Sequence, residues 1–274
     1  MSTLGWLLLA GGIVAASLTS SEGIGVKLTL AVASIVGCMA LATAVILQFL
    51  PLHPQLKVNV VASPVGGAWQ AMNSPASRVP SHGVHSLGQT FAIDLIYAPA
   101  GLSPQPRKGM RRPEEFPSFR RPIHAPADGT VVTTYGRGRD HLSRVGSFAM
   151  AYMFIEAMFR QLCGTYGLFG NHITLDIGKE KYAVLAHLRK GSILVKKGQE
   201  VHEGELLAEC GNSGNSSEPH LHFQLMDHPR ATVAMGIPFS FKDIELEGRI
   251  QTTVPANKEI FRGLHRGITW SPGP

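Results

Sequence analysis

Charged residues make up only 16% of the 274 residues, which is low for a soluble domain. The shortage is concentrated at the N-terminus, because residues 1–56 contain only two charged side chains, Glu22 and Lys27. These two cancel, so the net charge of +6 lies in residues 57–274. No dense run of Lys and Arg with interleaved aromatic residues occurs there, which argues against nucleic acid as a partner. The positive charge suits an anionic cell wall or lipid surface, with a merely soluble basic domain as the alternative.

Cysteine is also scarce, with three residues and no CxxC motif. Cys38 lies in an apolar stretch, whereas Cys163 and Cys210 are far apart in the sequence. A bridge between the last two is not required by any pattern, and no disulfide framework is indicated. Cysteine usage therefore does not identify the compartment of the protein.

Two apolar segments occupy the charge-poor N-terminus. Leu28–Leu47 is twenty uncharged residues long, and a helix of that length covers roughly 30 Å, the thickness of a bilayer core. We therefore predict a transmembrane helix at residues 28–49. Residues 4–19 are shorter, and because no Lys or Arg precedes them we favour a first span over a cleaved signal peptide. Lys27 in the connecting turn favours a cytoplasmic turn, which would place the large domain outside the membrane.

The rest of the chain predicts a β-rich domain. Residues 51–80 contain several prolines and small residues, which is typical of a juxtamembrane linker leading into a first strand. Short β-prone runs separated by turns then recur through residues 81–245, and residues 246–274 are predicted to be a C-terminal extension. Within the domain, residues 137–169 interrupt the strand pattern, since apolar residues recur there near helical spacing. We expect an inserted helix that packs on the sheet, with a lid or a membrane-contacting element as the alternative.

Paired histidines provide the first chemical signal. His220 and His222 lie two residues apart in an expected strand, so both side chains point to one face of a sheet. Asp94 ends the apolar run from Thr90, and a buried carboxylate there needs a cation or a metal as partner. Zinc takes three or four N, O or S ligands, and a catalytic site leaves one position open. The pattern thus indicates a metal site.

Four segments resemble, in order, the motifs of the M23 (lysostaphin/LytM-type) metallopeptidases. The segments are HAPADGTVV at residues 124–132, YAVLAHL at residues 182–188, VKKGQEVHEGELLA at residues 195–208 and GNSGNSSEPHLHFQ at residues 211–224. The resemblance covers about residues 82–241. It implies a mainly β fold, an M23/LytM-like antiparallel sheet of the duplicated hybrid motif type with a groove.

The resemblance also implies a site. The zinc ligands map to His85, Asp94 and His222, and the catalytic histidines map to His187 and His220. One departure concerns the first ligand, because the common pattern places it four residues before the aspartate, where this sequence has Thr90. A longer gap makes His85 the best match, with His82 as its competitor.

Together with the two apolar segments, the resemblance implies a membrane-anchored zinc metalloendopeptidase that acts on peptidoglycan on the extracytoplasmic side of the cell membrane. One Zn²⁺ per chain is expected, and a protein activator could be a further partner. Two alternatives remain: a catalytically silent membrane regulator with the same fold, and a metallopeptidase with a non-wall peptide substrate.

Overall fold

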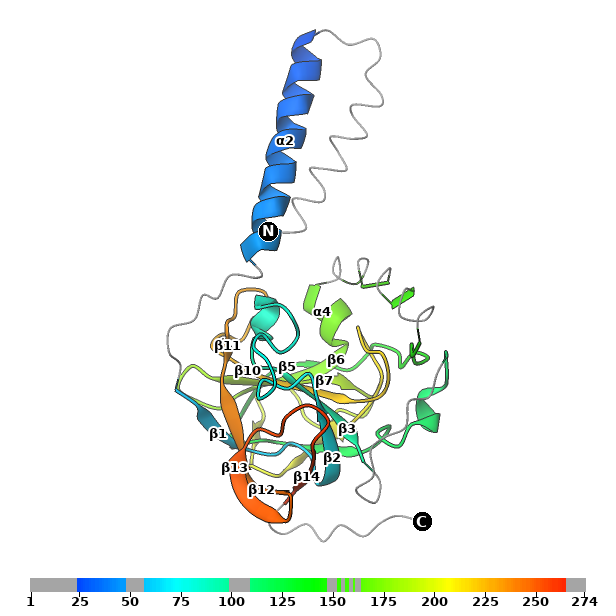
Figure 1. Cartoon of the computed structure of the whole chain (residues 1–274), viewed down its shortest axis with the longest axis vertical. Coiled ribbons are helices and arrows are strands. Elements are labelled where there is room, and N and C mark those ends of the chain that lie inside the picture. The colour runs from blue at the N-terminus through cyan, green and yellow to red at the C-terminus, as the bar shows by residue number, and fades with distance from the viewer. Residues whose placement is uncertain are drawn as a thin grey trace. The chain divides into compact units, whose positions relative to one another are not determined.

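The computed structural model describes residues 24–47, 57–98, 109–146 and 164–264, together with residues 152, 153, 156, 157 and 160. The chain divides into two compact units, Met1–Leu52 and His53–Pro274 (Figure 1). Each unit is described by itself.

The N-terminal unit contains helix α2, Ile24–Leu47, which has one charged residue, Lys27. Several of its apolar side chains are exposed, among them Leu28, Ile35 and Met39. Within the described part of the chain, no helix combines the length and apolar character needed to cross a membrane. The helix expected from the apolar run is therefore present, but its role as a span is not confirmed. The other expected span, residues 4–19, lies outside the described residues.

The C-terminal unit is built mainly from β-strands, as the sequence predicted. The path of the large sheet runs through ten strands in the order β1 (Asn59–Ala62), β12 (Phe239–Leu246), β14 (Ile260–Gly263), β2 (Gly67–Met72), β3 (Ile93–Tyr97), β10 (Leu221–Met226), β7 (Tyr182–Leu188), β6 (Asn171–Asp176), β5 (Gly129–Tyr135) and β8 (Glu200–Val201). Strand β11 (Gly236–Ile237) pairs with β10, and β13 (Arg249–Thr253) pairs with β12. A second sheet joins β4 (Pro122–His124) to β9 (Leu206–Glu209). All these pairings are antiparallel except that of β1 with β12.

Short helical segments connect some strands. They are η1 (Ser86–Gly88), η3 (Pro113–Glu115) and α4 (Gly164–Phe169). The described positions between residues 152 and 169 are all helical, which agrees with a helix in the insert, and the other positions of residues 147–163 lie outside the described residues.

The two faces of the central strands differ sharply in chemistry. On β10, Leu221, Phe223 and Leu225 are fully buried in the main core. Because successive side chains of a strand alternate between faces, His222 and Gln224 project to the opposite face. Strand β3 follows the same rule, with Asp94 between two core residues. One face of the sheet thus holds the main core, and the other holds buried polar groups beside a smaller apolar cluster that includes Val184, Ala186 and Met226.

Strands at both ends of the C-terminal unit extend beyond the boundaries expected from the sequence. Strand β1 coincides with the first strand expected within residues 51–80, whereas β2 in the same range was not expected, and β13 and β14 lie in the expected C-terminal extension. Strand β14 pairs with β2 on one side and with β12 on the other, so it joins an early strand of the C-terminal unit to a late one. Among the β-prone runs of residues 81–245, the run at residues 193–195 is not a strand in the structure. Pairing partners distant in sequence, rather than local propensity, decide these elements.

Candidate active site

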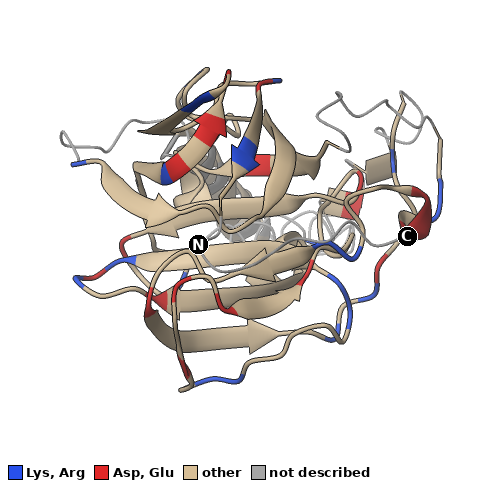
Figure 2. Ribbon diagram, turned by 90° about the horizontal axis from the view of Figure 1, so that it is seen from below, with Lys and Arg blue, Asp and Glu red and all other residues tan. Residues whose placement is uncertain are grey.

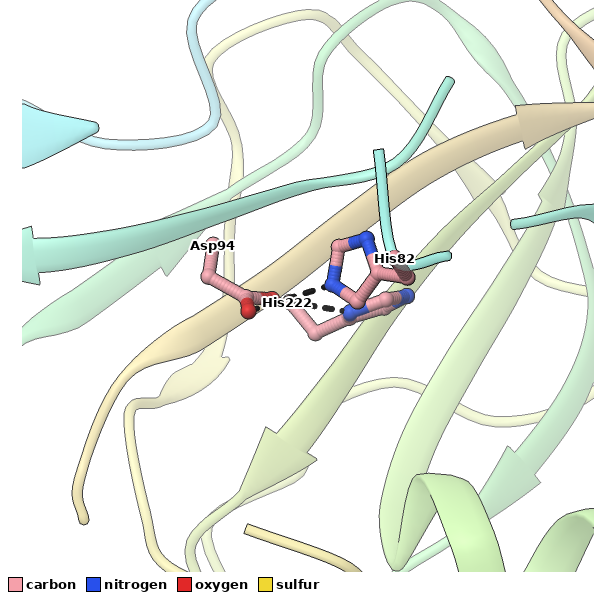
Figure 3. Close-up of side chains that lie close together, drawn as sticks. All are labelled: His82, Asp94 and His222. Carbon is pink, nitrogen blue, oxygen red and sulfur yellow. Dashed lines mark hydrogen bonds and ion pairs between the residues drawn. The ribbon is translucent and has the colours of Figure 1, made fainter. Parts of the chain in front are cut away.

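His222 and Asp94 lie at facing positions on the neighbouring antiparallel strands β10 and β3. The Nδ1 atom of His222 is 2.9 Å from Oδ1 of Asp94, and both side chains are buried (Figure 3). The sheet therefore brings together two residues that are far apart in the sequence.

A third side chain reaches the same carboxylate from the loop before β3. The Nε2 atom of His82 is 3.1 Å from Oδ2 of Asp94, and the rings of His82 and His222 are 4.9 Å apart. One ligand atom from each of the three residues lies within 4.8 Å of the others. Figure 3 shows both imidazole rings turned toward the carboxylate.

The structure corrects the expectation that His85 completes this group. Nδ1 of His85 lies 3.1 Å from the hydroxyl of Thr90, and His85 is not in the cluster found among the described residues. The backbone N–H of Ser81 donates to the carbonyl oxygen of Thr90 at 3.0 Å, so the chain closes a loop there. His82 stands at the base of that loop, beside the strand that carries Asp94, whereas His85 lies further along the loop. The structure thus brings His82, the competitor, rather than His85 to Asp94 and His222.

His220 stands immediately before β10 and faces the same group. Its Nδ1 is 2.8 Å from the carbonyl oxygen of Glu218, which only accepts, so Nδ1–H is the donor. The Nε2 atom is thereby directed to the site, 3.5 Å from Oδ1 of Asp94. The hydroxyl of Ser216 donates to the same carbonyl oxygen at 2.8 Å and holds the turn in place.

His187 reaches the site through a β-bulge. Strict alternation along β7 would place His187 on the core face with Leu185, but the pairing with β6 shifts there, so that β7 holds one extra residue. His187 has a φ of 61°, and the next residue, Leu188, is the one that enters the core. The bulge turns the ring of His187 toward His220, with ring centres 4.8 Å apart. Its Nδ1–H donates to the carbonyl oxygen of Ser213 at 2.8 Å, which leaves Nε2 facing the site.

The electrostatics of the group follow from burial and proximity. Burial alone would raise the pKa of Asp94, but the charges of His82 and His220 hold it well below its usual value. Burial alone would lower the pKa of His220, yet the neighbouring Asp94 carboxylate raises it. The pKa of His187 is well below its ordinary value, because burial and the adjacent His220 disfavour a positive charge. Burial also lowers the pKa of His222.

The surroundings of His222 fit a metal ion. Its Nε2 lies 3.0 Å from the amide oxygen of Gln224, and its Nδ1 faces Asp94. Both partners are acceptors, yet a neutral imidazole carries one N–H. A cation between Nδ1 and the carboxylate would satisfy the second contact. Imidazole nitrogen and carboxylate oxygen are also the ligands that zinc accepts, so His82, Asp94 and His222 fit this metal.

Sequence reasoning missed two neighbours of the group. Gln224 is the last residue of the GNSGNSSEPHLHFQ motif. Its position two residues after His222 was the signal that it lies on the same face of the strand as that histidine. Phe169, at the end of α4, stacks on His222 with ring centres 5.9 Å apart. No local pattern marks Phe169, because the contact depends on how the insert returns to the sheet.

Comparison with known proteins identifies the domain that holds this group. Residues 116–233 match the model of Peptidase family M23. This part of the chain belongs to peptidase family M23. His187, His220 and His222 lie inside the match, whereas His82 and Asp94 precede it and join the M23 segment through the pairing of β3 with β10.

Relatives of the M23 domain include bacterial peptidases. An uncharacterized metalloprotease of Haemophilus influenzae is 29% identical over 177 residues, which is 61% of this chain and 31% of that protein. The peptidoglycan DD-endopeptidase ShyB of Vibrio cholerae is 31% identical over 150 residues, or 53% of this chain and 29% of that protein. The chain thus spans less than a third of the length of either relative. The catalytic domain of lysostaphin from Staphylococcus simulans is 20% identical, with a TM-score of 0.29 over 54% of this chain and 77% of that one.

A cavity of about 240 Å³ lies on Phe169, the residue that stacks on His222, and none of the five site residues lines it. It is bordered by Phe169 and Met226, and Phe169 also stacks on His222. The rest of its wall consists of Thr133, Thr165, Tyr166, His172, Thr174, Pro229, Arg230, Ala231 and Thr232. A hollow of mixed polarity therefore lies beside Phe169, one ring contact from His222.

Proposed function

We propose that the protein is a zinc-dependent endopeptidase that hydrolyses peptide bonds in peptidoglycan. The observation that carries this proposal is the convergence of His82, Asp94, His220, His222 and His187 on one buried point of an M23-family sheet.

His82, Asp94 and His222 would hold the zinc ion. Each offers one ligand atom, and three protein ligands leave a coordination position open, as catalytic zinc sites do. Bound zinc would lower the pKa of a water molecule toward neutrality and polarise the carbonyl of the scissile bond. The mutual distances of 2.9 and 3.1 Å would need to open only slightly for an ion to enter.

His220 would accept the proton of the attacking water at Nε2. Its Nδ1–H is held by a backbone carbonyl, so the other ring nitrogen is the one available for proton transfer. Asp94 lies 3.5 Å from that nitrogen and stabilises the positive charge that forms on the ring. The same proton can then pass to the leaving amine.

His187 would assist as a neutral ring. Because its Nδ1–H is donated to Ser213, Nε2 is a lone pair that accepts a hydrogen bond from water or substrate. A neutral His187 in this tautomer does not donate to an oxyanion, which makes it an orienting group beside His220.

Peptidoglycan is favoured as substrate by the relatives and by the charge of the chain. ShyA and ShyB of Vibrio cholerae are both named peptidoglycan DD-endopeptidases, and ShyA is 39% identical over 66 residues, 24% of this chain and 15% of that protein. The net charge of +6 suits an anionic wall. Figure 2 shows basic and acidic segments interspersed along strands and loops, so this attraction would be diffuse.

The test combines metal analysis with digestion of purified cell walls by the full chain. We expect one zinc ion per chain and release of muropeptides, and His222→Ala should lose both. If the chain binds zinc and cleaves another peptide but does not cleave the wall, the alternative of a non-wall peptide substrate would be supported. A folded protein that binds no zinc and cleaves nothing would contradict the proposal and leave the regulator alternative.

The membrane location predicted from residues 1–50 stays a proposal, with the M23 domain on the extracytoplasmic side. Fractionation of cells and protease accessibility of the M23 domain in intact spheroplasts would test it. Recovery of the full chain in the cytoplasmic fraction would refute it.

A further inference from the structure

Gln224 lies two residues after His222 on β10, so both side chains project from the same face of the sheet. Its side chain is completely buried, at 0% exposure. Its amide oxygen lies 3.0 Å from Nε2 of His222, and its amide nitrogen donates to the carbonyl oxygen of Leu87 at 2.8 Å. One amide thus joins the strand that carries His222 to the loop that carries His82.

The contact with Leu87 determines which end of the amide faces the histidine. A carbonyl oxygen only accepts, so the amide nitrogen must face Leu87 and the amide oxygen must face His222. The amide oxygen also only accepts, so with a metal ion at Nδ1 the hydrogen of the neutral imidazole would be on Nε2. The lone pair on Nδ1, the nitrogen that lies 2.9 Å from Oδ1 of Asp94, would then face the ion.

The loop over Gln224 packs closely against β10 and β11. A Cβ atom on Gly88 would lie 2.9 Å from the amide nitrogen of Gln224, and Gly88 has a φ of +71°. On the other side, a Cβ atom on Gly236 would lie 2.6 Å from the carbonyl oxygen of Gly88. Glycine at both positions allows the loop to dock on β10 and β11. This docking accounts for how a histidine twelve residues before Asp94 reaches the carboxylate.

We propose that Gln224 is a positioning residue for the metal centre. It holds the hydrogen of His222 on Nε2 so that Nδ1 faces the metal, and it fastens the loop that presents His82. Groups that orient metal-binding histidines through their second nitrogen commonly contribute 10–100-fold, roughly, to metal affinity. The inference rests on the proposed zinc site.

Zinc affinity of the full chain, measured by competition with a chromogenic chelator, tests this role. Gln224→Leu removes both hydrogen bonds and should weaken binding by about 10–100-fold. Gln224→Glu keeps an oxygen acceptor for Nε2–H and should bind zinc more tightly than Gln224→Leu. Gln70→Leu is the matched control, since Gln70 is a buried glutamine of the same sheet that donates to the carbonyl of Lys258. It should bind zinc like the parent chain.

Unchanged affinity in a folded Gln224→Leu variant would overturn the inference, as would equal losses in both Gln224 variants. If the parent chain binds no zinc, the proposed function fails instead, so the two failures are distinguishable. Should Gln224→Leu not fold, long-range ¹H–¹⁵N spectra of the zinc-loaded parent chain decide the question. A hydrogen on Nε2 of His222 supports the inference, and a hydrogen on Nδ1 overturns it.

Discussion

His222 and Asp94 face each other across two antiparallel strands, with Nδ1 of the histidine 2.9 Å from Oδ1 of the aspartate. The two residues are 128 positions apart in the sequence. Every other member of the candidate site is arranged around this pair, which sits on the polar face of the central strands.

The assignment of His82 as a ligand can be tested against His85. Since His82 reaches Asp94 at 3.1 Å and His85 contacts Thr90, we expect His82→Ala to lose zinc and His85→Ala to retain it. Metal analysis of the two purified variants, with thermal unfolding as a check on folding, measures the difference. Loss of zinc from His85→Ala alone would restore the assignment made from the family resemblance.

His220 should separate metal binding from turnover. His220 is not one of the three ligands, so His220→Ala should keep its zinc while the rate of peptide hydrolysis falls by roughly 10²–10⁴-fold. His202→Ala is the control, because the side chain of His202 is 88% exposed. A His220→Ala enzyme with normal turnover would show that another group accepts the proton.

Gly170 supports the catalytic histidines through a close backbone contact. It has a φ of +61°, and a Cβ atom there would lie 2.4 Å from the carbonyl carbon of Ser213, whose oxygen holds His187. Gly170→Ala should therefore reduce both stability and turnover while zinc binding persists. Gly178→Ala provides the matched comparison, since Gly178 has a φ of +81° and no atom within 4 Å of the added Cβ.

The comparison separates backbone strain from the steric clash. Gly178→Ala should lower the free energy of unfolding by roughly 1–2 kcal/mol, the usual cost of a left-handed alanine. Gly170→Ala should lower it by more, because the loop of Ser213 must also move. Equal losses in denaturant unfolding, with full activity in both variants, would show that the contact with Ser213 is unimportant.

His141 should make the protein sensitive to acid. Burial, together with the nearby Arg144 guanidinium, lowers the pKa of His141 to about 4 from its usual 6.5. Between pH 6.5 and about 4, His141 therefore binds a proton in the unfolded chain but not in the folded chain. The free energy of unfolding falls as the pH drops through this range. The contribution is complete above pH 6.5 and amounts to roughly 3 kcal/mol.

Denaturant unfolding of the parent chain and of His141→Gln at several pH values measures this contribution. The variant should lose less stability than the parent chain between pH 6.5 and 4, because glutamine does not titrate there. His202→Gln should behave like the parent chain, since His202 is exposed. A parent chain and a His141→Gln variant with parallel pH profiles would contradict the lowered pKa.

The sequence alone determined the parts of this protein that depend on short-range pattern. The HLH segment predicts a strand that places His220 and His222 on one face, because strand side chains alternate, and the apolar run before Asp94 predicts a second buried strand. The order of four motifs indicated the M23 family. The resemblance in turn identified the histidine of the YAVLAHL strand, His187, as a candidate catalytic residue. These features are encoded within a few residues and do not depend on the rest of the chain.

Only the tertiary structure placed His82, rather than His85, beside Asp94 and His222. The choice depends on where the loop closes through Ser81 and Thr90 and on how Gln224 fastens it to β10. Likewise, the bulge that turns His187 away from the core arises from the register of β7 against β6, and the last strands join the sheet through β2. Register and loop docking are set by partners distant in the sequence, which is why local pattern could not specify them.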